Sequence, residues 1–314
     1  MSTDNLLSLG VVIVTYNRLN KLKKTLQLFD EQEVKLEYIL VFDNASTDGT
    51  EDYLKIWKSE ERNNICRIVI RSSDNTGGSG GFAGALIEAQ KQDAEWIWLS
   101  DDDAFPEKDA LLKAKEYLTL HQEKEKISAI CGEVINEGEI DTQHRRRIRQ
   151  TLLHIKEIDI DPSEYNKESF ELDEFSYVGV ILKKSVLKEA GITKADYFIN
   201  YDDTEHSMRI RKMGRIICVP AIKIHHDSGK MYYKTVTWTR YYYLRNRYFA
   251  LRDNFPHRYC LVYYCETSLW LAIKKIFKLK RKEELDMYQA AMLDIKLNKH
   301  GKHDIYKPGW RFSE

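Results

Sequence analysis

Three consecutive carboxylates, Asp101–Asp103, directly follow an apolar run that begins at Trp96. The apolar run predicts a buried strand of a parallel sheet, and open α/β sheets bind their ligands at the carboxyl ends of such strands. Adjacent carboxylates repel one another unless a cation lies among them. Asp101 and Asp103 would point to the same side of an extended segment and suit a hard divalent ion, Mg²⁺ or Mn²⁺. A solvated acidic turn that caps the next helix is the alternative.

Two further groups of polar residues lie at the ends of predicted elements, one at the start of a helix and one at the end of a strand. Asp202 and Asp203 precede a helix pattern, where capping alone would explain them, but a second carboxylate is what a mechanism with a metal ion and a general base requires. His225 and His226 end a strand pattern, and one neutral imidazole could complete the coordination of a metal ion at the three adjacent carboxylates. The chain has no HExxH or CxxC motif, so we expect no zinc hydrolase and no structural zinc site.

Polar or glycine-rich loops follow other predicted strands. Gly77–Gly81 would let backbone N–H groups approach a phosphate or a sugar at a helix N-terminus, unless the loop is only a flexible connector. Asp43 is placed to accept a hydrogen bond from a nucleobase near Thr15 and Arg18, although an Asx turn would explain it equally well. The GxGxxA spacing at 78–83 also allows a dinucleotide-binding fold, but Rossmann glycines should turn directly off the strand.

Strand and helix patterns alternate from residue 9 to about residue 121. This alternation predicts an α/β fold with a mainly parallel sheet flanked by helices, whose polar loops line one edge. After the glycine loop we expect a helix over about 82–92. Residues 136–174 are polar and predict irregular structure, and the basic run His144–Arg149 is expected to be a solvated loop, with anion binding as the alternative. Helical patterns continue to about residue 299 and form a C-terminal extension.

The charges of the chain balance as a whole but not locally. The 314 residues contain 49 basic and 49 acidic side chains, yet the segment 229–282 holds thirteen Lys and Arg against two acids. No apolar run approaches the roughly 18–20 residues that span a bilayer. Met1–Asn5 lack the basic region of a secretory signal, and the five cysteines without a CxxC pair suit a reducing compartment. We therefore expect a cytoplasmic protein.

The C-terminal region combines aromatic and basic side chains. The aromatic and apolar stretch 259–273 precedes a lysine-rich stretch, 274–282. Such a combination is typical of a protein that lies on an anionic membrane, here the inner face of the plasma membrane. A helical cap that packs on the catalytic domain, or on a partner in a homo-oligomer, is the alternative. A nucleic-acid-binding protein that uses residues 231–282 is a further alternative, which the zero net charge and the acidic crevice disfavour.

Taken together, the ordered motifs resemble family 2 glycosyltransferases over roughly residues 8–255. Within that family the glycine loop and the triple acid look most like galactofuranosyltransferases, and the Tyr-rich stretch around 245–247 is similar to rhamnosyltransferases. The motifs that carry the resemblance are Thr15–Arg18, Asp43–Thr50, Asn75–Phe82, Asp101–Asp103 and Asp202–Glu205.

The resemblance implies a GT-A fold and an inverting, metal-dependent glycosyltransferase. Its donor would be a nucleotide sugar, with UDP-galactofuranose favoured over dTDP-rhamnose, and its acceptor a hydroxyl of a glycan or polyprenyl-linked glycan in cell-surface polysaccharide synthesis. It divides the chain into a catalytic domain, 1–228, and a helical basic and aromatic region, 229–314. The catalytic domain would comprise a nucleotide-sugar-binding half, 8–125, and an acceptor half, 126–228.

The resemblance also implies a role for individual residues. The base is expected at Asp203, next to Asp202 in the same element, and the metal ion at Asp101 and Asp103. His226 fits the metal-ligand histidine of the family better than His225, although two adjacent histidines leave the register open. The donor set comprises Thr15, Tyr16, Asn17, Arg18, Asp43 and Asn44 around the nucleoside, and Asn75, Gly77, Gly78, Gly80, Gly81, Asp101 and Asp102 around the sugar and diphosphate.

Overall fold

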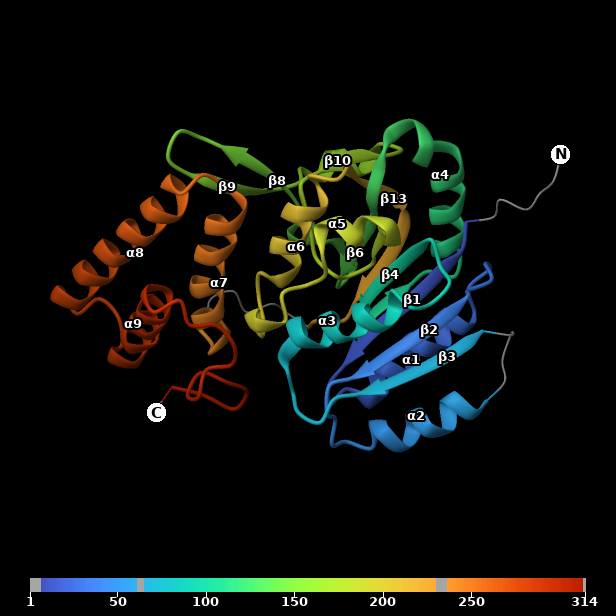
Figure 1. Cartoon of the computed structure of the whole chain (residues 1–314), viewed down its shortest axis with the longest axis horizontal. Helices are drawn as coiled ribbons and strands as arrows, with labels where there is room; N and C mark the ends of the chain where they lie inside the picture. Colours follow the sequence, from blue (N-terminus) through green and yellow to red (C-terminus); the bar gives the residue numbers. More distant parts are fainter. Residues whose placement is uncertain (1–6, 61–64, 230–235, 313–314) are drawn as a thin grey trace.

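The computed structural model describes residues 7–60, 65–229 and 236–312 (Figure 1). The residues Met1–Asn5, on which the expectation about a secretory signal depends, lie outside these ranges. The described chain forms a ten-stranded sheet and a separate three-stranded sheet, together with helices on both faces of the large sheet and a group of C-terminal helices.

The segment from residue 9 to about residue 121, predicted to alternate strands and helices, forms one side of the large sheet. Its strands β1 (Leu9–Thr15), β2 (Tyr38–Asp43), β3 (Cys66–Arg71) and β4 (Trp96–Asp101) are parallel, in the order β4-β1-β2-β3. The prediction of a mainly parallel sheet flanked by helices is therefore confirmed. Since these strands run in one direction, the loops that follow them meet at one edge.

The rest of the large sheet is mixed. Strand β12 (Val180–Lys183) is antiparallel to both β4 and β6 (Ile127–Asn136), and β13 (Arg215–His226) runs parallel to β6. The order continues from β4 through β12, β6 and β13 to β10 (Phe170–Leu172). The short strands β5 (Ala104–Pro106) and β7 (Glu139–Ile140) pair with β13 and β6.

Helices cover both faces of the sheet because its central strands are apolar on both sides. Along β1, Val11 and Ile13 belong to one core, whereas Val12 and Val14 belong to a second core on the opposite face. The first core is covered by α1 (Leu19–Asp30), α2 (Thr50–Ser59) and α4 (Ala110–Glu125). The second is covered by α3 (Gly77–Ala89), α5 (Leu187–Ala190) and α6 (Asp202–Ile210).

The helix expected from about Phe82 begins instead at Gly77, so the predicted start of this helix is wrong. The reason is a set of contacts that the local sequence does not show. The Oδ1 atom of Asn44 accepts a hydrogen bond from the Thr76 backbone N–H (2.9 Å), and its Nδ2 atom donates to the Gly77 carbonyl (2.8 Å). The Asn44 amide thereby supplies an acceptor for the Thr76 N–H, one of the backbone donors that lack an intrahelical partner at a helix start, and also bonds the first residue of the helix.

The irregular structure expected for 136–174 is also wrong in part. Strands β8 (Arg145–Gln150) and β9 (Ile155–Asp159) form an antiparallel hairpin, and β11 (Glu174–Phe175) pairs with β8. The basic run expected as a solvated loop thus lies in a strand. Arg145 is fully buried, because its guanidinium donates to the carbonyls of Gly132 (3.0 Å) and Val178 (2.7 Å) and so stays solvated by the backbone.

The predicted C-terminal helical extension is confirmed as α7 (Thr239–Asn254), α8 (Arg258–Ile276) and α9 (Lys282–Lys296). These helices share a core of their own, which includes Tyr241, Tyr242 and Met287. The β8–β9 hairpin reaches across to the start of α8 (Figure 1), where Gln150 Nε2 donates to the Tyr259 hydroxyl (2.8 Å). The division into domains at 228/229 stays a prediction.

Among the described helices, none is both long enough and apolar enough to cross a bilayer. The remaining regular elements are the short 3₁₀ turns Thr142–His144, Pro162–Asn166, Lys184–Val186 and Ala195–Tyr197.

Candidate active site

The three adjacent carboxylates lie where the sequence predicts, at the end of β4 beside the loop that follows β1. Asp102 and Asp103 are buried, and Asp102 Oδ2 accepts a hydrogen bond from the Thr15 hydroxyl (2.7 Å). Arg18 Nη1 lies 2.6 Å from Asp103 Oδ2 and 3.2 Å from Asp102 Oδ1. The end of β1 and the loop that follows it therefore hold the acids in place and partly neutralise them.

Asp101, Asp103 and His226, three of the four metal ligands expected from the sequence, form a group that could hold a metal ion. One ligand atom from each lies within 4.8 Å of the others, and His226 Nε2 is 3.4 Å from Asp103 Oδ1. Among the described residues, His226 Nδ1 is buried and makes no hydrogen bond. Two carboxylates and one imidazole suit Mn²⁺ or Mg²⁺, so the residues present fit a divalent ion.

His225 does not join this group. Successive side chains of a strand point to opposite faces, and His225 is directed away from Asp103. Its Nε2 atom lies 3.2 Å from Glu107 Oε1, and its side chain is half exposed. Of the two adjacent histidines proposed as metal ligands, the structure therefore brings only His226 to the carboxylates.

Burial and mutual repulsion set the charges of the three acids. Burial, with Asp103 as a second cause, raises the pKa of Asp101 to about 7. Burial also raises the pKa of Asp102 to about 6, against the opposing effect of Arg18. For Asp103 burial is outweighed by the hydrogen bond to His226 and by the charge of Arg18, and its pKa is lowered. A cation at this site would favour the ionised form of all three carboxylates.

A first cavity of about 340 Å³ opens beside the acids at the sheet edge. Many predicted donor-binding residues line it, and so do residues that the sequence analysis missed. Except for Val14, which directly precedes Thr15, the missed residues come from segments that carry no donor-binding motif. The predicted lining residues are Thr15, Tyr16, Arg18, Asn44, Asn75, Gly77, Gly78, Asp101 and Asp102, and the additional ones are Val14, Phe198, Ile199, Trp238 and Pro308.

Four residues predicted to bind the donor do not line this cavity. Asp43 is buried, accepts a hydrogen bond from the Ser46 N–H three residues on (2.9 Å) and pairs with Arg71, so its carboxylate is bonded within its own loop and to β3. Asn17 accepts a hydrogen bond from the Thr47 N–H (2.7 Å) and joins two loops. Gly80 and Gly81 instead pack closely against other parts of the fold, namely Thr76 and Val14.

The first two glycines of α3 differ in whether the fold has room for a side chain at their positions. Gly77 has a φ of +75°, and a Cβ atom there would lie 1.9 Å from the carbonyl oxygen of Phe198. Only glycine permits this approach between the glycine loop and the segment before α6. Gly78, in contrast, faces open space, and it lines both the first cavity and its neighbour.

The second cavity has a volume of about 420 Å³ and contains the second acid cluster. Asp101, Gly78 and Ile199 line both cavities, so the two share a wall at the triple acid. The remaining lining residues are Phe82, His144, Arg146, Ser176, Tyr177, Val178, Asn200, Tyr201, Asp202, Asp203, Thr204, His226 and Tyr243.

The two acids of the second cluster differ in electrostatic environment. Burial, together with the charge of Asp203, raises the pKa of Asp202 to about 8. Burial raises the pKa of Asp203 as well, but Arg146 and hydrogen bonds from Thr204 oppose that effect. The Thr204 N–H donates to Asp203 Oδ1 (2.6 Å), and Arg146 Nη2 donates to the Thr204 hydroxyl (2.8 Å). Asp203 is therefore the member of the pair for which a neighbouring cation, Arg146, opposes the rise in pKa.

An unusual backbone segment positions this cluster. Phe198, Asn200 and Tyr201 all have positive φ angles, of 66°, 64° and 71°, directly before α6. Residues other than glycine rarely adopt a positive φ angle. Backbone strain of this kind concentrates at functional sites. Asn246 of α7 holds the segment, because its Nδ2 atom donates to the carbonyls of Tyr197 (2.9 Å), Ile199 (3.0 Å) and Asn200 (2.9 Å). The sequence analysis assigned no role to Asn246.

The fold is that of the GT-A glycosyltransferases, as solved structures show. The structure of S. aureus TarS 1–349 with UDP-GlcNAc matches with a TM-score of 0.58 and 15% identity, over 92% of this chain and 81% of that one. The mannosyltransferase PcManGT from Pyrobaculum calidifontis, solved with GDP-Man and Mn²⁺, matches with a TM-score of 0.55 and 16% identity, over 92% and 86% of the two chains. These likenesses confirm the predicted fold.

The chain belongs to glycosyl transferase family 2, whose model matches residues 10–191. It is therefore a glycosyltransferase. Among curated relatives, the galactofuranosyltransferase GlfT1 of Mycobacterium tuberculosis is 26% identical over 318 aligned residues, which cover 96% of this chain and 98% of the relative. The predicted family and enzyme class are confirmed. Asp202, Asp203 and His226 lie beyond the matched segment, and the fold brings them to it.

Proposed function

We propose that this protein is an inverting glycosyltransferase that moves galactofuranose from UDP-galactofuranose to a hydroxyl group of a cell-surface glycan or a lipid-linked glycan. The observation that carries the proposal is the shared wall between the two cavities. Asp101 and Gly78 line both, so a nucleotide sugar bound in the first cavity would present its sugar to the cavity of Asp203. The similarity to GlfT1 over nearly the full length of both chains supports galactofuranose as the sugar.

Asp203 would act as the general base. An acceptor hydroxyl bound in the second cavity donates its proton to the Asp203 carboxylate as its oxygen attacks the anomeric carbon. The bond between that carbon and the donor diphosphate breaks on the opposite side, so the configuration inverts in one step. Burial and the charge of Asp203 raise the pKa of Asp202, which favours the protonated form of Asp202 and makes it less suited than Asp203 to act as the base.

The diphosphate leaves as an anion, and its charge has to be stabilised. A divalent ion held by Asp101, Asp103 and His226 would supply Lewis-acid stabilisation of that charge when bound. Arg18 adds a fixed positive charge beside the same acids, and backbone groups around Gly78 can approach the donor because no side chain intervenes. Tyr16 and Trp238 supply aromatic surface to the first cavity, which suits a nucleobase.

A calorimetric titration tests the donor and metal assignment. UDP should bind the protein in the presence of Mn²⁺, and Asp103→Asn and Asp101→Asn should each weaken that binding at least about 100-fold, since altering even the surroundings of a metal ligand costs about 10–100-fold. Asp93→Asn is the control, because Asp93 is exposed on the surface. Thermal unfolding of each variant separates lost binding from lost folding.

The same titration discriminates between the two sugars. Preference for UDP over dTDP, together with slow hydrolysis of UDP-galactofuranose, supports the galactofuranose assignment. Preference for dTDP and hydrolysis of dTDP-rhamnose would replace it with rhamnose. If neither nucleotide binds with Mn²⁺ or Mg²⁺ present, the first cavity is not a donor site and the proposal fails.

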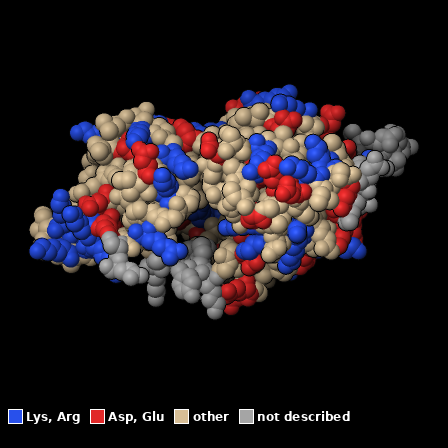
Figure 2. Space-filling model, turned by 90° about the horizontal axis from the view of Figure 1, so that it is seen from below, with Lys and Arg blue, Asp and Glu red and all other residues tan. Residues whose placement is uncertain are grey.

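We also propose that the outer face of α8 binds the surface of an anionic membrane. Leu261, Leu269, Ile273 and Ile276 are exposed and recur at helical spacing along one stripe. Figure 2 shows Lys and Arg gathered at the left end of the molecule, the end where α8 lies in Figure 1. Apolar side chains beside a basic cluster suit anionic headgroups, at about 1 kcal/mol per basic residue. The basic residues are Lys274, Lys275, Lys278, Lys280 and Arg281.

Vesicle flotation tests the membrane proposal. The protein should float with phosphatidylglycerol vesicles at low salt and not with phosphatidylcholine vesicles, and Ile276→Glu should reduce the bound fraction severalfold. Leu120→Glu serves as the matched control, because Leu120 is an equally exposed side chain on α4. Absence of flotation at low salt would refute the proposal. So would a stable dimer that Ile276→Glu dissociates, because the stripe would then contact a second copy.

A further inference from the structure

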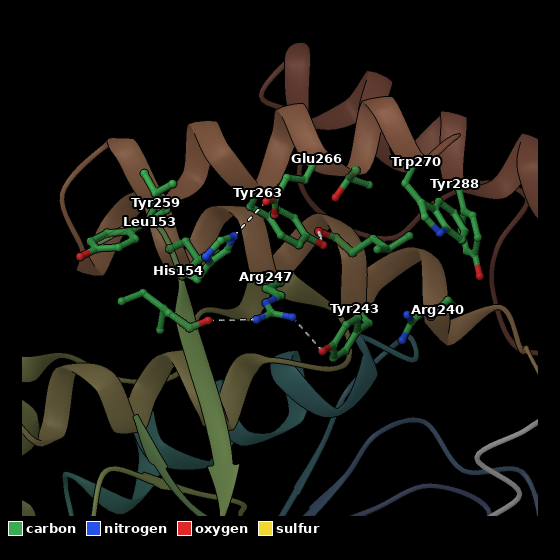
Figure 3. A pocket seen from close by; sticks show the side chains of 14 residues that line it. Leu153, His154, Arg240, Tyr243, Arg247, Tyr259, Tyr263, Glu266, Trp270 and Tyr288 are labelled. Carbon is green, nitrogen blue, oxygen red and sulfur yellow. Dashed lines mark hydrogen bonds and ion pairs between the residues drawn. The ribbon is translucent and has the colours of Figure 1, made fainter. Parts of the chain in front are cut away.

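A third cavity, of about 370 Å³, lies among α7, α8, α9 and the turn of the β8–β9 hairpin. Figure 3 shows Tyr243 and Arg247 of α7 facing Tyr259, Tyr263 and Glu266 of α8, with His154 of the hairpin at one side. The mechanism above assigns no task to this cavity. It is not isolated from the site, however, because Tyr243 lines both the second and the third cavity.

Aromatic rings from three helices form much of the wall. Trp270 and Tyr288 pack with their ring centroids 5.4 Å apart, and Tyr243 and Tyr263 face the interior from α7 and α8. Flat aromatic faces with hydroxyl groups at their rims bind ligands that combine apolar surface with hydrogen-bonding groups. Sugar rings have this character, with C–H groups on their faces and hydroxyl groups around their edges.

The wall also carries positive charge. Arg240 is exposed, lies 4.7 Å from the Tyr243 ring centroid and makes no ion pair with any carboxylate in the described chain. Arg247 lies 5.4 Å from the Tyr263 ring centroid, and its Nε atom is buried without a hydrogen-bond partner among the described residues. A guanidinium without a carboxylate partner, such as that of Arg240, is suited to a phosphate or carboxylate group.

The acidic groups near the cavity are already paired. Glu266 Oε1 lies 2.9 Å from His154 Nε2, and Glu157 Oε1 lies 3.5 Å from Arg247 Nη2 while Glu157 Oε2 pairs with Arg146 (3.0 Å). Arg240 therefore remains as a cation without a carboxylate partner at the edge of an aromatic cavity. This combination favours a ligand with both a sugar surface and a negative charge.

We propose that the third cavity binds a segment of the acceptor, a sugar that carries an anionic group, while a hydroxyl of the same acceptor reaches Asp203 through the second cavity. The wall shared at Tyr243 connects the two positions. The proposal rests on the proposed function, because it assigns the third cavity to the acceptor of that reaction. The anionic group is either a phosphate, as in the link between a glycan and a lipid, or the carboxylate of an acidic sugar.

Titrations with three soluble disaccharides test the proposal. Lactose is neutral, lactose 1-phosphate carries a phosphate, and digalacturonic acid carries carboxylates. At least one of the charged disaccharides should bind about 10-fold or more tightly than lactose. A gain with lactose 1-phosphate alone identifies a phosphate ligand, whereas a gain with digalacturonic acid alone identifies an acidic sugar.

Variants locate the binding. Arg240→Gln should remove the advantage of the charged disaccharide over lactose, and Trp270→Ala should weaken all three ligands severalfold. Arg149→Gln should keep the advantage, because Arg149 is an exposed arginine of β8 that does not line the cavity. Thermal unfolding checks that each variant folds.

Two results would overturn the inference: equal affinity for the three disaccharides, or an advantage that Arg240→Gln leaves intact. Absence of binding for all three at millimolar concentration would overturn it as well. The UDP titration with Mn²⁺ is run on the same preparation. If UDP binds and these disaccharide results fail, only the acceptor assignment falls; if UDP does not bind, the proposed function itself falls.

Discussion

The carboxyl edge of the sheet and the C-terminal helices supply the same site by different physical means. At the edge, parallel strands end together, so Thr15, Arg18 and Asp101–Asp103 converge as a direct consequence of strand order. On the other side, α7 acts through side chains that bond to the backbone of another segment, as Asn246 does with the carbonyls of Tyr197, Ile199 and Asn200. One region therefore carries chemical groups on a rigid sheet, and the other fixes the shape of a strained loop.

This difference predicts which measurements each region controls. Changes at the sheet edge should affect binding of the nucleotide and the metal ion. Changes in α7 should affect the alignment of Asp203 with the acceptor and leave nucleotide affinity nearly intact. The three predictions below test this separation.

The largest effect on turnover is expected from Asp203→Asn. The amide cannot accept the acceptor proton as a base, so kcat should fall about 10²–10⁴-fold, the range that general-base catalysis contributes. UDP affinity should change less than about threefold, because Asp203 does not line the first cavity. The control is Asp159→Asn, an exposed acid of β9. A variant that keeps its turnover would show that Asp203 is not the base.

A smaller but clear effect is expected from Asn246→Ala. Loss of the amide removes one donor from each of three buried or partly buried carbonyls, although Tyr197 keeps a donor in Arg245 Nη2 (3.2 Å), and should cost about 1–3 kcal/mol of unfolding free energy. Misplacement of the segment before α6 should lower kcat about 10²-fold, since small shifts of positioned groups have effects of that size. The KM for the donor should stay close to wild type.

Asn254→Ala is the matched control for this prediction, because Asn254 is also an asparagine of α7 and bonds to Glu205 (3.1 Å) outside the strained segment. Equal losses of kcat in both variants would show that α7 acts only through stability. A large rise in the donor KM of Asn246→Ala would show that the two regions are not separable.

The smallest effect is a shift of the pH profile in Arg146→Gln. Burial raises the pKa of Asp203, and Arg146 opposes that rise. Transfer requires the ionised carboxylate, so kcat/KM falls as the pH drops through this pKa, and removal of Arg146 should move the acidic limb to higher pH. Arg146→Lys should keep most of the wild-type profile, and Arg147→Gln, at an exposed neighbour, should keep all of it. An unchanged limb in Arg146→Gln would refute the coupling.

How far local sequence predicts structure also differs between the two regions. The apolar run into Asp101–Asp103 identified β4 and its acids, because burial on both faces and a strand end are written in consecutive residues. The prediction of a solvated loop at Arg145 was wrong, because the burial of this side chain depends on residues remote in sequence. A guanidinium that is exposed in most contexts is buried here, because carbonyls of Gly132 and Val178 happen to surround it.

The sequence by itself determined the parallel half of the sheet, the position of the triple acid and the family. These follow from the period of apolar residues and from short motifs, which depend on neighbours along the chain. Only the tertiary structure decided that His226 and not His225 joins the acids, that Asn44 starts α3 at Gly77, and that α7 holds the segment before Asp202. Each of these depends on a few ångströms between segments remote in sequence, and no periodicity records such a distance.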